Sequence, residues 1–482
     1  MAPSTLVLAL MFSSVLAQTQ SPWGQCGGSG YGGATICTSA YYCSTQGPYY
    51  AQCVPGTATT GAAGTTTKPA STSTSAASAT KPSSTLATVV RTSTPILATS
   101  TTSARSTTSA PITTSTAAAS GNPFVGKQMY PNPFYSSEVV NLAIPSLPTS
   151  LKAAASAVAI VPSFFWMDTR SKVPMQVLMG SMLDDIAAKN KAGANPPYMG
   201  IFVVYDLPDR DCSALASNGE YSTANNGVAN YKGYIDDIVA NLKNHSSVSV
   251  ALVVEPDSLG NLVTNLNVAK CANAQSAYLE CYNYALTHLN LPNVAMYIDA
   301  GHAGWLGWSA NLQPAADLFA QVYKNASSPA AVRGLVTNVA NYNAWSIATC
   351  PSYTQGNANC DEKRYINALA PLLQAEGFPA HFITDTGRDG VQPTSQQAWG
   401  DWCNVKGAGF GARPGTNTGD PLEDAFVWVK PGGESDGTSN SSSTRYDAHC
   451  GYADALTPAP EAGSWFQAYF QQLLTNANPS FT

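Results

Sequence analysis

The chain has 482 residues, which is long enough for one or two domains with a sizeable hydrophobic core. Lys and Arg number 23 and Asp and Glu number 29, so the formal net charge is −6 and the chain lacks the basic face that nucleic-acid binding requires. No Asp or Glu occurs before residue 121, so any chemistry that depends on carboxylates belongs to the last three quarters of the chain.

The chain opens with an apolar run at residues 6–16 that ends in Val15-Leu16-Ala17. This pattern predicts a secretion signal over residues 1–17. No later stretch has 18 uninterrupted apolar residues, so we expect no membrane-spanning segment. The eleven cysteines of a secreted chain favour disulfides over metal sites, and their odd number leaves at least one unpaired.

Residues 18–55 are rich in Gly, Cys and Tyr and carry no charge. Their four cysteines allow three pairings, among which spacing does not choose. The segments WGQCGG (23–28) and PYYAQC (48–53) resemble the fungal family 1 carbohydrate-binding module. The resemblance implies the disulfides Cys26–Cys43 and Cys37–Cys53 and a flat cellulose-binding face of Trp23, Tyr49, Tyr50, Gln25 and Gln52. Aromatic rings stack on pyranose faces, whereas the alternative is that these rings only fill a small core.

More than half of residues 56–120 are Ser or Thr, and none is aromatic. Such a segment cannot bury enough apolar surface to fold. We expect an extended, O-glycosylated linker here, followed by a second folded domain over residues 121–482.

Short apolar runs alternate with amphipathic stretches after residue 121. The runs cover residues 157–161, 199–204, 248–254, 294–298, 334–339, 380–383 and 425–429, and helices are predicted at 175–191, 230–242, 273–289, 315–324 and 361–376. This alternation predicts a parallel sheet covered on both faces, and about 360 residues fit a β/α barrel with its active site at the carboxyl ends of the strands. An open doubly wound sheet is the alternative, but no GxGxxG or Walker pattern supports it.

The loops after these strands hold many carboxylates and tryptophans and no cluster of metal ligands. Such loops suit hydrolysis of a neutral glycosidic bond, because one acid protonates the leaving oxygen and a base activates water. The segments at residues 205–212, 254–259, 299–308 and 428–437 resemble family 6 glycoside hydrolases of the fungal cellobiohydrolase II type. The resemblance implies a distorted seven-stranded parallel β/α barrel, inversion at the anomeric carbon, and release of cellobiose from non-reducing ends inside a tunnel, without a cofactor or a metal.

The resemblance also implies roles for individual residues. Asp257 becomes the general acid and Asp211 its companion carboxylate, while Asp436 is the candidate base, acting directly or through water that Ser217 helps to hold. Tyr205 would distort the sugar ring, and Arg210 and Asp299 would orient the acids. The predicted sugar contacts are Trp166, Asp168, Asp299, His302, Trp305, Trp308, Asn341, Trp402, Lys430 and Glu434.

Glu255 competes with Asp257 for the acid role, because alternation along a strand points both positions the same way if the strand extends that far. A carboxyl separation of about 5 to 5.5 Å would indicate retention, and about 6.5 to 9.5 Å would indicate inversion. For Asp206 and Asp209 we favour ordinary capping or ion pairing.

The resemblance further implies the disulfides Cys212–Cys271 and Cys403–Cys450, whereas the short spacing of Cys350 and Cys360 suggests another loop disulfide. Cys281 is then unpaired. Asn244, Asn325 and Asn440 begin glycosylation sequons.

The two resemblances imply a monomeric, inverting, exo-acting cellulase that binds crystalline cellulose and cello-oligosaccharides, and the composition predicts a secreted chain that binds neither nucleic acid nor membranes. The alternatives are an endo-acting β-1,4-glucanase of the same fold and a non-catalytic cellulose-binding protein.

Overall fold

The computed structural model describes residues 19–20, 25–27, 34–39, 41–47, 50–55, 121–174 and 178–481. The predicted signal, the whole predicted linker, Trp23 and Tyr49 lie outside these residues, and so do the side chains of Gln25, Tyr50 and Gln52. None of the helices in the described ranges combines the length and the apolar character needed to cross a membrane.

The described N-terminal residues form two small sheets. Strands β2 (Gln25–Gly27), β5 (Tyr50–Pro55) and β4 (Tyr41–Gly47) pair antiparallel in that order, and β1 (Thr19–Gln20) pairs parallel with β3 (Ile36–Cys37). The disulfides Cys26–Cys43 and Cys37–Cys53 link these strands, as the resemblance implies. The buried side chains here are Cys26, Ala51 and Cys53, so covalent links replace the hydrophobic core that so few residues could not supply.

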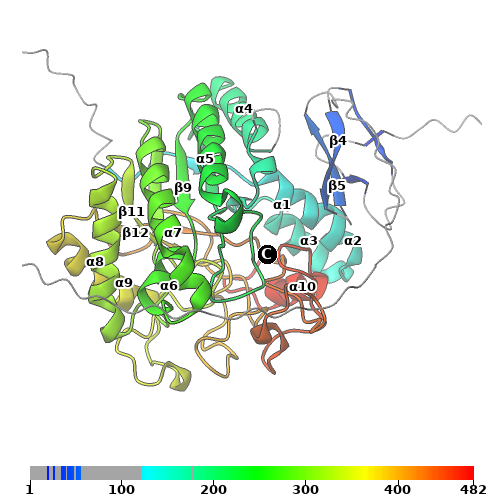
Figure 1. Cartoon of the computed structure of the whole chain (residues 1–482). Coiled ribbons are helices and arrows are strands. Elements are labelled where there is room, and N and C mark those ends of the chain that lie inside the picture. Colours follow the sequence, from blue (N-terminus) through cyan, green and yellow to red (C-terminus); the bar gives the residue numbers. More distant parts are fainter. Residues whose placement is uncertain are drawn as a thin grey trace, which may run out of the picture. The chain divides into compact units, whose positions relative to one another are not determined.

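The larger part of the structure is built on a curled parallel sheet (Figure 1). Its strands are hydrogen-bonded in the order β13-β12-β11-β10-β9-β8, with β6 and β7 pairing at opposite ends of β8. The strands are β6 (Gln128–Met129), β7 (Phe165–Met167), β8 (Tyr198–Val204), β9 (Val250–Val254), β10 (Val294–Asp299), β11 (Val332–Thr337), β12 (His381–Asp385) and β13 (Glu423–Val427). Where β13 and β7 are not paired as strands, the N–H of Phe164 donates to the carbonyl of Trp428 at 2.9 Å.

One predicted strand is wrong. Residues 157–161 form the end of helix α3 (Thr149–Val158) and the turn after it, and the strand is instead β7. The run AAASAV at 153–158 is rich in Ala, the strongest helix former, and its apolar residues Ala155 and Val158 are the buried side of a helix.

Helices cover the outer face of the sheet, and α4, α5, α7, α8 and α9 follow one another around it (Figure 1). The helices are α1 (Pro133–Glu138), α2 (Ile144–Ser146), α3, α4 (Leu178–Lys191), α5 (Gly227–Asn244), α6 (Ser258–Thr264), α7 (Ala269–His288), α8 (Ser309–Asn325), α9 (Glu362–Ala375) and α10 (Gln467–Thr475). A five-residue π-helix, Val139–Ala143, joins α1 to α2, and short 3-10 segments occur at Arg170–Lys172, Thr223–Asn225, Ser352–Thr354 and Ala448–Gly451.

Alternation along the strands creates two separate cores. In β9, Val250, Leu252 and Val254 pack against the helices, whereas Ala251 and Val253 join the cluster inside the curled sheet. Tyr205, directly after β8, belongs to the inner cluster. The loops at the carboxyl ends of the strands therefore continue from an apolar interior, which places their polar side chains in partly desolvated surroundings.

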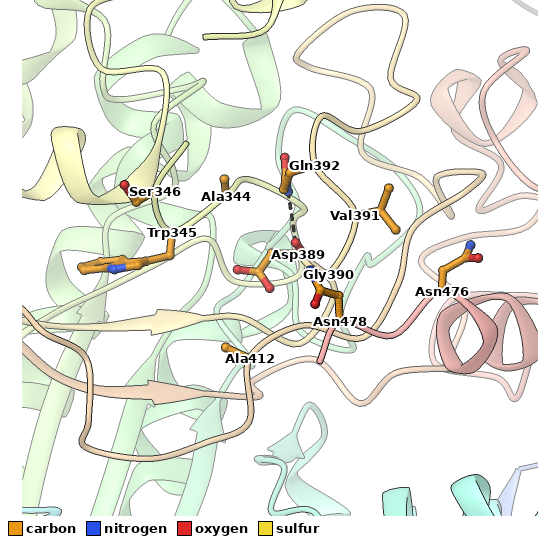
Figure 2. A pocket seen from close by; sticks show the side chains of 10 residues that line it. All are labelled: Ala344, Trp345, Ser346, Asp389, Gly390, Val391, Gln392, Ala412, Asn476 and Asn478. Atoms are coloured by element: carbon orange, nitrogen blue, oxygen red, sulfur yellow. Dashed lines mark hydrogen bonds between the residues drawn. The ribbon is translucent and has the colours of Figure 1, made fainter. Parts of the chain in front are cut away.

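A surface pocket of about 570 Å³ lies between the loops after β11 and β12 and the segment after α10 (Figure 2). Its lining includes Trp345, Asp389, Gln392, Asn476 and Asn478. None of the predicted site residues lines it, so the candidate chemistry lies elsewhere among the loops.

Candidate active site

The loop after β8 carries Asp211 and the loop after β9 carries Asp257. Both residues have a left-handed backbone, with φ of 56° and 66°. A positive φ is costly for residues other than Gly and persists only where the surrounding structure enforces it, so it marks candidate functional positions. Asp257 is also the residue immediately before helix α6.

Several contacts hold these two loops together. The hydroxyl of Ser213 donates to Oδ1 of Asn261 at 2.7 Å, which joins the Asp211 loop to α6. The disulfide Cys212–Cys271 joins the same loop to α7, and Nζ of Lys270 donates to the carbonyl of Asp211 at 3.0 Å. The predicted acid and its companion are therefore brought to one region.

Electrostatics distinguish Asp257 from an ordinary carboxylate. Burial, followed by the charges of Asp299 and Asp211, raises the pKa of Asp257 well above its usual range. Burial also raises the pKa of Asp211, although the N–H of Ser217 donates to its Oδ2 at 2.7 Å and lowers it. A carboxyl group that stays protonated beside other acids can donate a proton in mildly acidic solution.

Asp299, the last residue of β10, supports Asp257 directly. Its Oδ2 accepts the N–H of Asp257 at 2.9 Å and the N–H of Gly301 at 3.1 Å, while Oδ1 is buried with no protein partner. Burial raises the pKa of Asp299 to about 7 although these two N–H groups lower it. Asp257 and Asp299 therefore titrate as a coupled pair.

The side chain of Glu255, the competing acid candidate, is bonded to the backbone of the loop after β8. Its side chain is 1% exposed and accepts the backbone N–H groups of Asp206 and Leu207 at 3.2 and 3.4 Å. Burial raises the pKa of Glu255 to about 7. Because its oxygens point to the base of the β8 loop, Glu255 braces that loop.

Arg210, the residue before Asp211, packs against the ring of Tyr205. The guanidinium of Arg210 lies 4.4 Å from the ring centre of Tyr205, and it donates to the carbonyls of Tyr205, Asp168 and Ser217. Arg210 also forms a buried ion pair with Asp206 at 3.1 Å. Burial and then the charge of Asp211 raise the pKa of the Tyr205 hydroxyl, and Asp257 adds to this effect, so Tyr205 lies close to both acids.

The predicted indoles are only partly buried, but each is fixed by its surroundings. Nε1 of Trp166 donates to the carbonyl of Val429 at 2.8 Å, and Nε1 of Trp305 donates to the hydroxyl of Thr264 at 2.7 Å. Nε1 of Trp308 donates to the carbonyl of Gly304 at 2.8 Å. The ring of Trp402 lies 5.4 Å from that of His449. These contacts leave the indoles with set orientations, as a sugar-stacking site needs.

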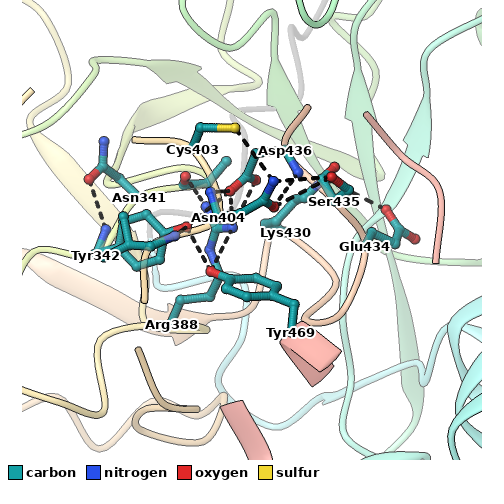
Figure 3. A network of polar contacts seen from close by, with 12 residues as sticks. Asn341, Tyr342, Arg388, Cys403, Asn404, Lys430, Glu434, Ser435, Asp436 and Tyr469 are labelled. Carbon is teal, nitrogen blue, oxygen red and sulfur yellow. Dashed lines mark hydrogen bonds and ion pairs between the residues drawn. The ribbon is translucent and has the colours of Figure 1, made fainter. Parts of the chain in front are cut away.

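Asp436 is the centre of a buried polar network (Figure 3). Nη1 of Arg388 donates to both of its carboxylate oxygens at 2.8 Å, and Oδ2 also accepts the hydroxyl of Tyr342 at 3.0 Å and the N–H of Asn404 at 2.8 Å. The side chain of Arg388 is 1% exposed. Asp436 is thus ion-paired and enclosed, whereas a base that takes a proton directly must reach a water molecule.

Lys430 and Glu434 lie beside this network, on the loop after β13. Nζ of Lys430 donates to the carbonyl of Ser435 at 3.3 Å and lies 3.9 Å from Oε2 of Glu434. Burial raises the pKa of Glu434 while Lys430 lowers it. Asn341 is buried, with its side-chain oxygen accepting the N–H of Tyr342.

The sequence models of two known protein families match this chain. Glycosyl hydrolases family 6 matches residues 124–477, and the fungal cellulose binding domain matches residues 22–50. The chain belongs to glycosyl hydrolases family 6.

Relatives and solved structures agree with this assignment to family 6. The chain is 69% identical over 478 residues, or 99% of each chain, to the probable 1,4-beta-D-glucan cellobiohydrolase C of Aspergillus fumigatus. It is 66% identical to the catalytic core domain of the cellobiohydrolase Cel6A of Chaetomium thermophilum, with a TM-score of 0.74 over 75% of this chain and all of that one. Cellobiohydrolase II (Cel6A) of Humicola insolens, solved in complex with glucose and cellotetraose, is 61% identical with the same TM-score and coverage.

Two residues near the predicted site, Asn343 and Glu362, were not predicted from the sequence. Nδ2 of Asn343 donates to Oε1 of Glu362 at 2.8 Å, and its Oδ1 accepts the indole N–H of Trp399 at 2.7 Å. Nδ1 of His302 lies 3.1 Å from the same amide nitrogen, and burial lowers the pKa of His302 to about 4. This network supports the loop that carries Trp305 and Trp308. Its members come from four separate loops and helices, so no local sequence motif predicts it.

The structure also shows the contacts of the remaining predicted carboxylates, the cysteines and the exposure of the sequon residues. Asp168 pairs with Lys172 at 2.5 Å, and Asp209 accepts the N–H of Thr223 at 3.1 Å as a cap. The structure contains the disulfides Cys350–Cys360 and Cys403–Cys450, and Cys281 is unpaired and buried. The three sequon residues, Asn244, Asn325 and Asn440, are exposed.

Proposed function

We propose that this protein is a secreted, inverting, exo-acting cellulase, a 1,4-β-glucan cellobiohydrolase that releases cellobiose from non-reducing ends of cellulose. One observation carries the proposal: in a family 6 chain, Asp257 has a raised pKa and lies among the carboxylates of Asp211 and Asp299 at the carboxyl ends of β8, β9 and β10. The names of the relatives and the match to a cellulose-binding domain support the choice of cellulose as substrate.

In the proposed reaction Asp257 protonates the glycosidic oxygen as the bond to the anomeric carbon breaks. The negative charge of Asp211 stabilises the oxocarbenium-like transition state and favours protonated Asp257 beforehand. Tyr205, which is packed between Trp166 and Arg210, would press the sugar toward a distorted ring. Arg210 fixes the loop of Asp211 through the carbonyl of Ser217, and Asp299 fixes the backbone of Asp257.

Water must attack from the opposite face of the sugar for inversion. Asp436 remains our candidate base. Because its oxygens are engaged by Arg388, Tyr342 and Asn404, we propose that it receives the proton through a water chain, with Ser217 holding one of the waters.

The substrate would be gripped by stacking and by hydrogen bonds to its hydroxyls. The proposed stacking platforms are Trp166, Trp305, Trp308 and Trp402, and the proposed polar contacts are Asp168, Asp299, His302, Asn341, Lys430 and Glu434. The proposed organisation is a signal at 1–17, a cellulose-binding module at 18–55 with Trp23, Tyr49 and Tyr50 on its face, a linker at 56–120 and the catalytic domain at 121–482.

The acid is tested by the full chain carrying Asp257→Asn. Loss of a general acid costs about 10²- to 10⁴-fold, so cellobiose release from amorphous cellulose should fall by that range. Asp209→Asn is the matched control, since Asp209 lies in the neighbouring loop and only caps Thr223. Unchanged release by Asp257→Asn would remove the acid assignment, and a rapid fall in viscosity of soluble substituted cellulose by the unmodified protein would favour endo-acting cleavage.

The base is tested by Asp436→Ala with and without azide. A small anion can replace the activated water, so azide should restore turnover and give the glycosyl azide of inverted configuration if Asp436 is the base. If Asp436 serves only the ion pair with Arg388, azide has no effect and the loss follows the fall in the thermal midpoint.

A further inference from the structure

Residues 445–450 touch the loop that carries Asp211. Nη2 of Arg445 donates to the carbonyl of Ala216 at 2.5 Å, and Oδ2 of Asp447 accepts the N–H of Leu215 at 3.2 Å. Ala216 and Leu215 lie within the loop that runs from Asp211 to Ser217. The segment therefore holds the middle of that loop through two backbone groups.

The same segment also touches the loop of Trp402. Oδ1 of Asp447 contacts Nδ1 of His449 at 2.8 Å, and the His449 ring lies 5.4 Å from the Trp402 ring at an interplanar angle of 32°. The disulfide Cys403–Cys450 ties the residue after Trp402 to the residue after His449. The carboxylate of Asp447 thus contacts the Asp211 loop with one oxygen, and with the other it contacts His449, whose ring lies beside that of Trp402.

We propose that Asp447 and His449 are positioning residues that couple the Trp402 sugar platform to the loop carrying Asp211. The effect on turnover rests on the proposed function, whereas the contact between the imidazole and the indole does not. Neither residue needs to touch substrate, because each acts through the group that it holds.

The charge on His449 decides how firmly the pair holds. Its hydrogen bond to Asp447 raises the pKa of His449 above its usual value, burial opposes this, and Asp401 and Asp454, from the other segments packed around it, add to the increase. Arg445 is the nearby cation on its own segment. In mildly acidic solution an imidazolium is held between a carboxylate and an indole face, both of which attract it. As the pH rises through the pKa of His449 the attraction weakens, and the grip of Trp402 on sugar should weaken with it.

The test uses the full chain with His449→Gln, which keeps a hydrogen-bond donor for Asp447 but cannot become charged. We expect KM for cellohexaose to rise several-fold in acid with kcat nearly unchanged, and the dependence of KM on pH to disappear. Asp447→Asn should also lower kcat, because it weakens the contact to the Asp211 loop. His288→Gln is the matched control, since its ring stacks on Tyr284 at the end of α7.

Tryptophan emission gives a readout that needs no catalysis, because an imidazolium quenches an adjacent indole. The difference in emission between the unmodified chain and Trp402→Phe should titrate with pH, and this titration should vanish in His449→Gln but not in His288→Gln. A titration that survives His449→Gln, or a KM profile that His449→Gln leaves unchanged, would overturn the proposal. If the protein releases no cellobiose at all, the proposed function fails while the emission titration still decides the contact.

Discussion

The carboxylate of Asp299 influences the pH range over which Asp257 stays protonated. It is 1% exposed, it accepts the N–H of Asp257, and its charge is the second cause, after burial, of the raised pKa of Asp257. A general acid works only while protonated, so activity is present below the pKa of Asp257 and is lost as the pH rises through it.

Asp299→Asn should therefore shift the alkaline limb of the kcat/KM profile to lower pH. The substitution removes the repelling charge, which lowers the pKa of Asp257, but it keeps an oxygen that can accept the N–H of Asp257. The profile is measured on a soluble cello-oligosaccharide, and the control is Asp317→Asn, because Asp317 lies on the exposed side of helix α8. A limb that stays in place or moves to higher pH would contradict the coupling.

Residue identity was predictable from motifs, but residue environment was not. Alternation along β9 gives positions 255 and 257 the same side of the strand, yet β9 ends at Val254 and both residues adopt a positive φ. Glu255 consequently turns to the loop after β8 while Asp257 lies beside Asp299. Arg388 and Asn404, which enclose Asp436, lie 48 and 32 positions before it in the chain, and no spacing rule encodes such contacts.

At the scale of elements, the close pairing of β11 with β12 depends on Gly334. A Cβ at this position would lie 1.8 Å from the carbonyl oxygen of His381, which is backbone and cannot rotate away. Gly334 pairs with His381 in the register of the two strands.

Gly334→Ala should therefore lower the free energy of unfolding by about 1–3 kcal/mol, as overpacking does in a tight interior. Chemical denaturation followed by tryptophan emission measures the change. Gly400→Ala is the matched control, because a Cβ there meets nothing within 4 Å. Equal midpoints for the two variants would mean that β11 and β12 separate at little cost.

The elements were largely predictable because strands and helices bury continuous or periodic apolar runs. Strand β8 and helix α9 lie within one or two residues of their predicted bounds. The strand predicted at 157–161 was wrong because, over only five residues, the apolar pattern of a helix with one buried side cannot be distinguished from that of a short strand. The chain between β12 and β13, residues 386–422, has no helix or strand, and long-range bonds such as Cys403–Cys450 hold it in place.

At the scale of the whole molecule, a pair of acids joins the first helix of the barrel to the loop after the last strand. Glu138 ends α1 and Glu434 follows β13, and the charge of Glu434 acts on the buried carboxyl group of Glu138. Burial, and then Glu434, raises the pKa of Glu138 well above 4.5, and burial also raises that of Glu434. The folded chain therefore binds more protons here than the unfolded chain does.

The sign of the pH dependence follows from these raised values. The stability that the pair contributes is fully present below the unfolded pKa near 4.5 and is lost as the pH rises through the folded values. Glu138→Gln puts an amide that cannot ionise in place of the carboxyl group, so the thermal midpoint of this variant should fall less steeply between acid and neutral pH than that of the unmodified chain. Glu280→Gln, which removes an exposed partner of Lys232, is the control and should keep the original slope. Parallel curves for Glu138→Gln and the unmodified chain would place the pH sensitivity of the fold outside this pair.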